Sequence, residues 1–139
     1  MPRNDLNAGL DDDSPLKLLS CYAANGVTRF PMLYELRIYD SVPGKLPAVV
    51  ARFENATVKL FEKHAIQQVG FWTVVIGESN AKLYYILKWD SLDERQKKLA
   101  AFQVDPDWIA ARNKSEEAGP IVASISNTIL TPTNFSALK

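Results

Sequence analysis

The sequence predicts an α+β domain built on one four-stranded antiparallel sheet with helices on one face. Three observations lead to this prediction. Four segments have the apolar pattern of strands, two amphipathic helical stretches separate them, and the order is strand, helix, strand, strand, helix, strand. That order is the split βαβ, or ferredoxin-like, arrangement.

The first strand is expected over residues 32–40, where side chains alternate with a period of two. One face carries Met32, Tyr34, Leu36 and Ile38, and the other carries Leu33, Glu35, Arg37 and Tyr39. The second set is polar but long-chained, which suits a partly enclosed surface. We expect Glu35, Arg37 and Tyr39 to point toward the interior of a dimer or barrel.

A long helix is expected over residues 45–64, after the break at Pro43-Gly44. Its apolar residues recur at steps of three and four from Leu46 to Phe61, which indicates a single buried stripe. The charged residues between these positions, Arg52 among them, are expected on the outside. His64 continues the buried stripe at the C-terminal end of the helix.

The second and third strands are expected over residues 66–76 and 81–89, joined by a turn at residues 77–80. Both faces of the second strand are largely apolar. A helix over residues 92–103 begins with the capping-box spacing of Ser91 and Glu94. A second helical piece starts with Asp105 as N-cap, extends to about residue 118, and is followed by the last strand over residues 121–130.

Residues 1–31 differ from the rest, because acidic residues and turn formers dominate them. We expect a poorly ordered extension there, or a short helix over residues 15–24, followed by the folded domain over residues 32–139. We also expect that translation can start at Met32, which stands immediately before the first strand. The segment has neither the basic start and apolar block of a secretory signal nor the composition of a mitochondrial transit peptide.

The overall composition excludes several classes of protein. The 16 basic and 16 acidic residues cancel, which argues against a nucleic-acid surface. No apolar run is long enough to span a bilayer. The single cysteine, Cys21, can form neither an intrachain disulfide nor a cysteine metal site, so a reducing compartment, the cytoplasm, is expected. No metal and no cofactor is predicted.

The apolar character of the strands on both faces predicts a homodimer. Helices can cover only one face of such a sheet, and the other face is normally polar. A second copy packed sheet against sheet would cover the remaining apolar face.

Short motifs spread through every element resemble the NIPSNAP family over residues 32–138. They are Pro43-Gly44-Lys45-Leu46, Phe61-Glu62-Lys63-His64, Gly70-Phe71-Trp72, Ile76-Gly77, Asp105-Pro106-Asp107-Trp108, Ala111-Arg112, Ser115-Glu116, Leu130-Thr131-Pro132-Thr133 and Phe135-Ser136. The resemblance implies a subunit of the dimeric α+β-barrel type, but no settled activity. One departure is Ala65, where the family usually has glycine. Either the helix ends differently here or alanine accepts a strained conformation.

Several residues are candidates for a site, and each also has a purely structural interpretation. His64 is a candidate proton carrier, or a hydrogen-bonded side chain that closes its helix. Glu35, Arg37 and Tyr39 can bind a polar or anionic molecule, or form an internal ion-pair network. Trp72 and Tyr85 can line an aromatic pocket, or serve packing. Trp108, Arg112 and Glu116 share a helix ridge, from which they can rim a pocket; Arg112 and Glu116 are expected to pair locally.

Three functions remain open from the sequence. The first is a soluble homodimeric protein that binds a small molecule. The second is a cofactor-independent monooxygenase or isomerase acting on a small aromatic or polyketide-like compound. The third is a module that binds another protein. A cavity lined by His64, Trp72 or Tyr85 would favour the first two, and a filled interior the third.

Overall fold

The computed structural model describes residues 32–139, and the expectations for residues 1–31 lie outside this part. The elements are β1 Leu33–Ser41, the helical segments α2 Leu46–Arg52, η2 Phe53–Thr57 and α3 Val58–Lys63, β2 Gln67–Thr73, β3 Lys82–Trp89, α4 Leu92–Gln103, α5 Pro106–Ser115 and β4 Val122–Leu130. The predicted order of elements and the α+β, ferredoxin-like fold are confirmed. Between residues 32 and 139, no helix is both long and apolar enough to cross a membrane.

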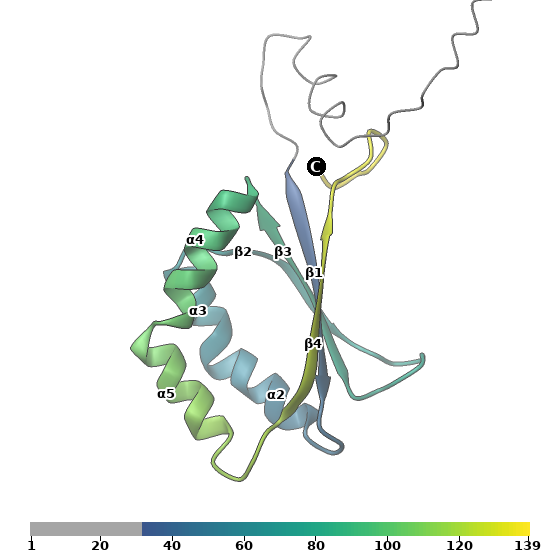
Figure 1. Ribbon diagram of the computed structural model, residues 1–139. Helices are drawn as coiled ribbons and strands as arrows, with labels where there is room; N and C mark the ends of the chain where they lie inside the picture. Colours follow the sequence, from purple (N-terminus) through teal and green to yellow (C-terminus); the bar gives the residue numbers. More distant parts are fainter. Residues whose placement is uncertain (1–31) are drawn as a thin grey trace, which may run out of the picture. The chain divides into compact units, whose positions relative to one another are not determined.

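The four strands form one antiparallel sheet in the order β2-β3-β1-β4. All the labelled helices lie on the same side of this sheet (Figure 1). We call that side the helix-covered face and the opposite side the open face. Because cross-strand partners project to the same side of a sheet, the register assigns each strand residue to one of them.

The register corrects the expected direction of the first strand. Arg37 is paired with Tyr85, which is fully buried beneath the helices, so Glu35, Arg37 and Tyr39 belong to the helix-covered face. The open face receives the apolar set that includes Leu36, which is paired with Ile86. Alternation separates the two faces of a strand but does not say which one meets the helices. Here the polar set is buried because a helical residue, Arg95, completes its hydrogen bonds.

The core lies between the helices and the sheet and is rich in aromatic rings. It consists of Tyr39, Val49, Phe53, Leu60, Phe61, Ile66, Leu83, Tyr85, Leu87, Trp89, Phe102, Trp108 and Ile121. Phe71 stacks on Tyr85 with ring centroids 5.3 Å apart, and Phe102 lies against Trp108 with centroids 4.7 Å apart. Alternate residues of β3 supply the centre of the core, as the period of two predicts.

The helical stretch from Leu46 to Lys63 contains a π-helical turn over Phe53–Thr57. A π turn holds more residues than an α turn and therefore shifts the phase of the helix. The stretch ends in a Schellman motif, where Ile66 N donates to Phe61 O (2.8 Å) and Ala65 N donates to Glu62 O (3.0 Å). Ala65 has a φ of 52°, so alanine accepts the left-handed conformation.

Helices α4 and α5 begin with the predicted caps. Ser91 Oγ accepts a hydrogen bond from Glu94 N (3.0 Å), and Asp105 caps α5 by accepting from Asp107 N (2.9 Å). Glu94 returns its bond to the backbone N–H of Asp90 (2.6 Å), one residue before the N-cap. Helix α5 ends at Ser115, three residues earlier than expected.

Strand β2 ends at Thr73 rather than at residue 76. Thr73 is paired with Leu83, near the start of β3, so the residues beyond it have no partner strand among the described residues. Val75 and Ile76 are 93% and 96% exposed as a result. Two β-branched residues therefore project from the tip of the β2–β3 connection.

Candidate functional site

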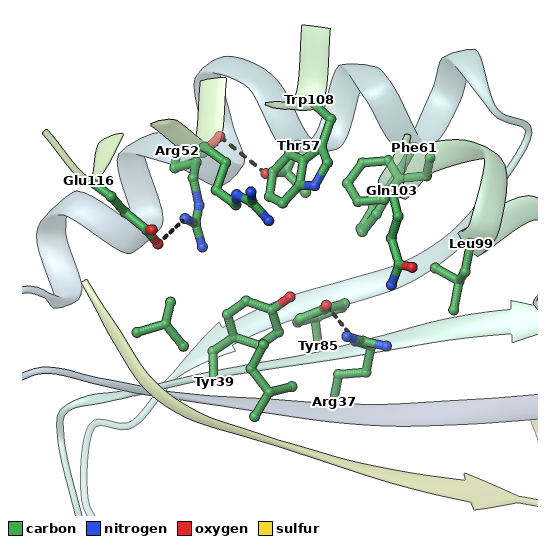
Figure 2. A pocket seen from close by; sticks show the side chains of 14 residues that line it. Arg37, Tyr39, Arg52, Thr57, Phe61, Tyr85, Leu99, Gln103, Trp108 and Glu116 are labelled. Atoms are coloured by element: carbon green, nitrogen blue, oxygen red, sulfur yellow. Dashed lines mark hydrogen bonds and ion pairs between the residues drawn. The ribbon is translucent and has the colours of Figure 1, made fainter. Parts of the chain in front are cut away.

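A cavity of about 360 Å³ lies between the helices and the helix-covered face of the sheet. Arg37, Tyr39 and Tyr85 line it from the sheet, and Arg52, Thr57 and Trp108 line it from the helices (Figure 2). Its apolar wall consists of Phe61, Leu99, Phe102, Trp108, Val122 and Ile125. This volume and this mixture of apolar walls with a few polar groups are typical of small-molecule sites.

Arg52 is a buried cation on the helical side of this helix–sheet cavity. Its Nη1 donates to Ser115 Oγ (3.3 Å) and to Glu116 Oε1 (3.1 Å), and its guanidinium carbon lies 5.4 Å from the centroid of the Trp108 ring. Its Nε is buried and has no acceptor between residues 32 and 139. Leaving a buried donor unsatisfied costs about 1–3 kcal/mol. The hydrogen-bonding capacity of Arg52 is therefore incompletely used.

The π turn explains why Arg52 faces the cavity and not solvent, as the sequence pattern had predicted. Arg52 ends α2, and the π-helical residues begin immediately after it. The wider turn breaks the regular spacing of three and four on which the prediction rested. Thr57, the last residue of the turn, also lines the cavity, and its Oγ1 donates to Arg52 O (3.4 Å).

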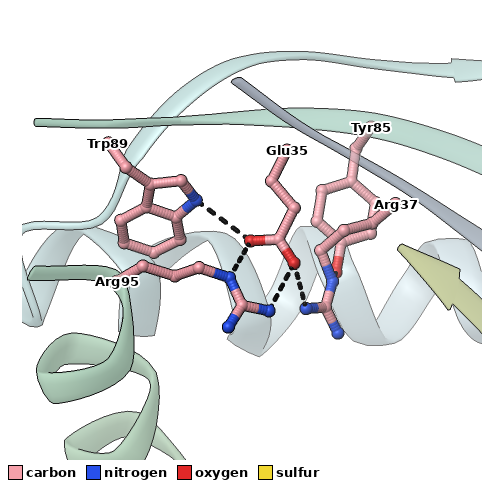
Figure 3. Close-up of polar contacts among 5 residues, drawn as sticks. All are labelled: Glu35, Arg37, Tyr85, Trp89 and Arg95. Carbon is pink, nitrogen blue, oxygen red and sulfur yellow. Dashed lines mark hydrogen bonds and ion pairs between the residues drawn. The ribbon is translucent and has the colours of Figure 1, made fainter. Parts of the chain in front are cut away.

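Glu35 is a fully buried carboxylate whose hydrogen bonds are all supplied from within the fold (Figure 3). Its Oε1 accepts from Arg37 Nη1 (3.1 Å) and Arg95 Nη2 (2.7 Å), and its Oε2 accepts from Trp89 Nε1 (3.0 Å) and Arg95 Nε (2.8 Å). Burial raises the pKa of Glu35, but the hydrogen bonds and charges of Arg95 and Arg37 lower it by more. The net pKa lies below the ordinary value, so Glu35 is held as a carboxylate.

Tyr85 connects this cluster to the cavity. Its hydroxyl oxygen accepts a hydrogen bond from Arg37 Nε (2.7 Å). Burial raises the pKa of Tyr85, Tyr39 raises it further and Arg37 opposes the rise, so that the pKa lies well above its ordinary value. Tyr85 is therefore a neutral phenol. Because its oxygen is already an acceptor for Arg37, its own hydrogen can be donated to Tyr39 or to a bound molecule.

The charges that line the cavity do not balance. Arg37 is paired with Glu35, and Arg52 is paired with Glu116. Arg112 also lines the cavity, but it belongs to none of the ion pairs formed within the described part of the chain. The predicted local pair of Arg112 with Glu116 is wrong, because Arg52 engages the Glu116 carboxylate from the neighbouring helix. One positive charge at the lining is left without a carboxylate.

The structure brings together most of the predicted site residues. Arg37, Tyr39, Tyr85, Trp108 and Arg112 all line the cavity, and the expectation that the ridge of α5 rims a pocket agrees with this placement. Glu35 lies behind Arg37. Four further polar lining residues, Arg52, Thr57, Gln103 and Glu116, were not among the predicted ligand-binding residues, although Glu116 was placed on the same ridge.

Trp72 and Tyr85 do not line a common pocket. Trp72 is paired with Tyr84, and the next position along the strand, Phe71, is paired with Tyr85. Trp72 therefore lies on the open face, where it is 49% exposed. A side chain added at Gly70 would come within 2.8 Å of its indole ring, so only glycine fits beside it.

His64 does not line the cavity. Its Nε2 lies 2.7 Å from Asp105 Oδ2, and Lys63 Nζ lies 2.8 Å from the same oxygen. The hydrogen bonds from Lys63, His64 and the backbone of Asp107 lower the pKa of Asp105. This contact joins the C-terminal end of α3 to the N-terminal cap of α5, which agrees with the structural interpretation of His64. Within residues 32–139, no group of three or more His, Cys, Asp or Glu is placed to hold a metal ion.

Comparison with known proteins gives the family. The NIPSNAP family profile matches residues 34–137, which is more than half of the chain. The chain is 31% identical over 75 residues to Protein NipSnap homolog 3B of Mus musculus; the match covers 54% of this chain and 30% of the mouse protein. It thus spans less than a third of that relative.

Two solved structures agree with this result. One is a NIPSNAP family protein of unknown function from Agrobacterium tumefaciens, with a TM-score of 0.70 and 28% identity, covering 78% of this chain and 95% of that one. The other is an uncharacterised NIPSNAP-like domain protein from Burkholderia xenovorans, with a TM-score of 0.67 and 25% identity, covering 76% of this chain and 88% of that one. With its fold, its motifs and the profile match in agreement, the chain belongs to the NIPSNAP family.

Proposed function

We propose that this chain is a homodimeric protein that binds a small organic molecule in the helix–sheet cavity of each subunit. The observation that carries the proposal is the cavity itself. It has about 360 Å³ of space, an aromatic wall, and hydroxyl and guanidinium groups that converge on it from both the sheet and the helices. Such convergence of a few polar groups on an apolar pocket is the usual form of a ligand site.

The open face supports the homodimer. It carries Trp72 with half of its surface exposed, flanked on β3 and β1 by further apolar side chains such as Ile86 and Leu36. Close to it, Val75 and Ile76 are almost fully exposed. Apolar surface of this kind is usually covered by a partner, and a second copy offers the same face for a two-fold contact.

Two lysine substitutions test the dimer in the full-length chain. Trp72→Lys places a charge on the open face, whereas Ile109→Lys places one on a partly exposed apolar position of α5. In analytical ultracentrifugation at micromolar concentration, the parent protein and Ile109→Lys sediment as dimers and Trp72→Lys shifts toward the monomer. A monomeric parent protein would refute the dimer.

Ligand binding is tested by native mass spectrometry of the protein purified gently from its host. The proposal expects a small molecule retained at up to one copy per subunit, and loss of that adduct when the cavity is filled by Leu99→Trp. An adduct that survives this substitution would place the ligand elsewhere. A protein that retains no adduct and shows no thermal shift with any of a broad metabolite panel would contradict the proposal.

Tyr85 favours a second candidate function, a cofactor-independent monooxygenase or isomerase. It is a neutral phenol held by Arg37 at the wall of the cavity, where its hydroxyl can donate a hydrogen bond to an oxyanion that develops on a bound substrate. Tyr85→Phe removes the hydroxyl and keeps the ring. If the protein is an enzyme of this class, Tyr85→Phe lowers turnover of the retained compound without removing binding; equal turnover by both proteins would exclude this role for Tyr85.

A further inference from the structure

We infer that the ligand of the helix–sheet cavity is an organic monocarboxylic acid, whose carboxylate binds Arg52 and Arg112 and whose apolar body lies along the aromatic wall. This inference rests on the proposed ligand-binding function and names the chemical class of the ligand. It is carried by the unused donor of Arg52, by the unbalanced charge of Arg112, and by the apolar composition of the remaining wall.

Arg52 has guanidinium donors that no described residue uses. Glu116 and Ser115 both take Nη1, and the Trp108 ring supports the flat side of the group. Nε is buried and has no acceptor among the described residues, and Nη2 forms none of the side-chain hydrogen bonds within residues 32–139, although Arg52 lines the cavity. A carboxylate is the group that fits a guanidinium edge, because its two oxygens match two parallel N–H donors.

Arg112 is placed to share the same anion. Trp108, Arg112 and Glu116 follow one another at steps of four on α5 and its C-terminal end, so they lie on one ridge. Arg52 contacts both ends of this ridge, the Trp108 ring and the Glu116 carboxylate. Arg112 lies between these two contacts and lines the cavity with Arg52.

The charge balance favours a single negative charge on the ligand. At this end of the cavity, Glu116 balances one of the two guanidinium groups of Arg52 and Arg112, which leaves one positive charge there, while Glu35 is shared by Arg37 and Arg95. A monoanion neutralises this charge, whereas a dianion such as a phosphomonoester would bring an excess negative charge next to Glu116. The carboxylate of an organic acid has the required charge at neutral pH.

The opposite part of the cavity is suited to an apolar body. Figure 2 shows Arg52 and Glu116 at one end of the lining, and Leu99, Gln103 and Arg37, whose charge is paired with Glu35, at the other. Phe61, Phe102 and Leu99 contribute the apolar surface, so a phenyl ring or a short acyl chain is expected to lie there.

The test compares acids with uncharged molecules of the same shape. Binding of 3-phenylpropionate and octanoate to the full-length protein is measured by calorimetry beside their primary amides, with phenyl phosphate as a third arm. Because a charge-assisted hydrogen bond is expected to contribute at least a tenfold gain, at least one acid should bind roughly ten times or more as tightly as its amide.

Three variants locate the anion. Arg112→Gln and Arg52→Gln are expected to weaken binding of the acid about tenfold or more while affecting the amide little. Lys114→Gln removes the same charge from an exposed position of the same helix and is expected to change neither. Unfolding curves of each variant check that the fold is retained, and Arg112, which is exposed, provides the test should Arg52→Gln fail to fold.

The outcomes separate the inference from the function on which it rests. Amides that bind as tightly as the acids, or a phosphomonoester that binds more tightly than either, would overturn the carboxylate and leave small-molecule binding standing. If Lys114→Gln weakens binding of the acid as much as Arg52→Gln and Arg112→Gln do, the placement of the anion at Arg52 and Arg112 is overturned. Failure of acids, amides and phosphomonoester to bind, together with no adduct from the host, would overturn both.

Discussion

Two buried charged clusters on the helix-covered face resemble each other in composition but differ in completeness. At Glu35, a carboxylate receives hydrogen bonds from Arg37, Arg95 and Trp89, and both of its oxygens are used. At Arg52, one nitrogen serves Glu116 and Ser115 while Nε has no acceptor among the described residues. Both clusters reach the cavity, through Arg37 and through Arg52, but only the second keeps a buried donor without an acceptor among the described residues.

This difference distinguishes a structural cluster from a binding cluster. Burying a charge is tolerated only when hydrogen bonds replace its hydration, and Glu35 meets this condition without any other molecule. Arg52 meets it only in part. Because the hydrogen bonds of Glu35 are complete within the fold and those of Arg52 are not, we expect a ligand to bind at Arg52 and not at Glu35.

The largest effect is expected from Glu35→Gln. The substitution keeps the shape of the side chain but leaves Arg37 and Arg95 without their carboxylate in a buried setting. Breaking a buried pair in this way costs about 3–5 kcal/mol of the free energy of unfolding, measured by urea denaturation. Asp93→Asn, in an exposed pair with Lys97, serves as the control and is expected to cost less than about 0.5 kcal/mol.

A smaller effect is expected from Arg52→Met. This change removes the pair with Glu116, which is partly exposed, but it also removes the unsatisfied donor. The two contributions oppose each other, so the loss should stay below about 2 kcal/mol in urea denaturation. If Arg52→Met destabilises the protein as much as Glu35→Gln, both clusters are structural and the comparison fails.

Ala65→Gly is expected to stabilise the protein by about 1 kcal/mol. Ala65 has a φ of 52°, where a Cβ is unfavourable and glycine is not. Thermal unfolding measures the gain. The control is Ala100→Gly on the exposed side of α4, which should lose about 0.5–1 kcal/mol because its backbone is helical. A loss at both positions would contradict the assigned strain at Ala65.

Lowering the pH is expected to have the smallest effect, counted as the change in the free energy of unfolding per pH unit. Folding lowers the pKa of Glu35, so below its ordinary value of 4.5 the unfolded chain binds more protons than the folded one. Its contribution to stability is therefore present above about pH 5 and is lost as the pH falls through the folded pKa. For one carboxylate the slope cannot exceed roughly 1.4 kcal/mol per pH unit. In Glu35→Gln, the midpoint of urea denaturation should fall less steeply as the pH is lowered below about 5. An unchanged slope would contradict the lowered pKa assigned to Glu35.

Much of the fold could be predicted because it follows from local rules. The third strand lies close to its expected range, and Ser91 and Asp105 cap their helices as expected. The departure at Ala65 left two alternatives, a different helix end or an accepted strain, and its positive φ agrees with the second. In each case the determining interactions lie within a few residues along the chain.

The site was only partly predictable, because it depends on contacts between distant elements. Nothing in the letters of Phe53–Thr57 distinguishes a π turn from an α turn, so Arg52 was assigned to the solvent side. The direction of Glu35 depends on Arg95, which is 60 residues away along the chain. Alternation could not reveal that Trp72 and Tyr85 point to opposite faces of the sheet without the register of β2 with β3.

The most direct test of the account is a crystal structure of the protein with the tightest-binding organic acid. We predict a carboxylate oxygen within about 3.2 Å of a guanidinium nitrogen of Arg52, with Arg112 near the same anion and the apolar body beside Phe61 and Phe102. A bound acid that leaves the Arg52 guanidinium without an oxygen neighbour, or that lies outside the helix–sheet cavity, would contradict this.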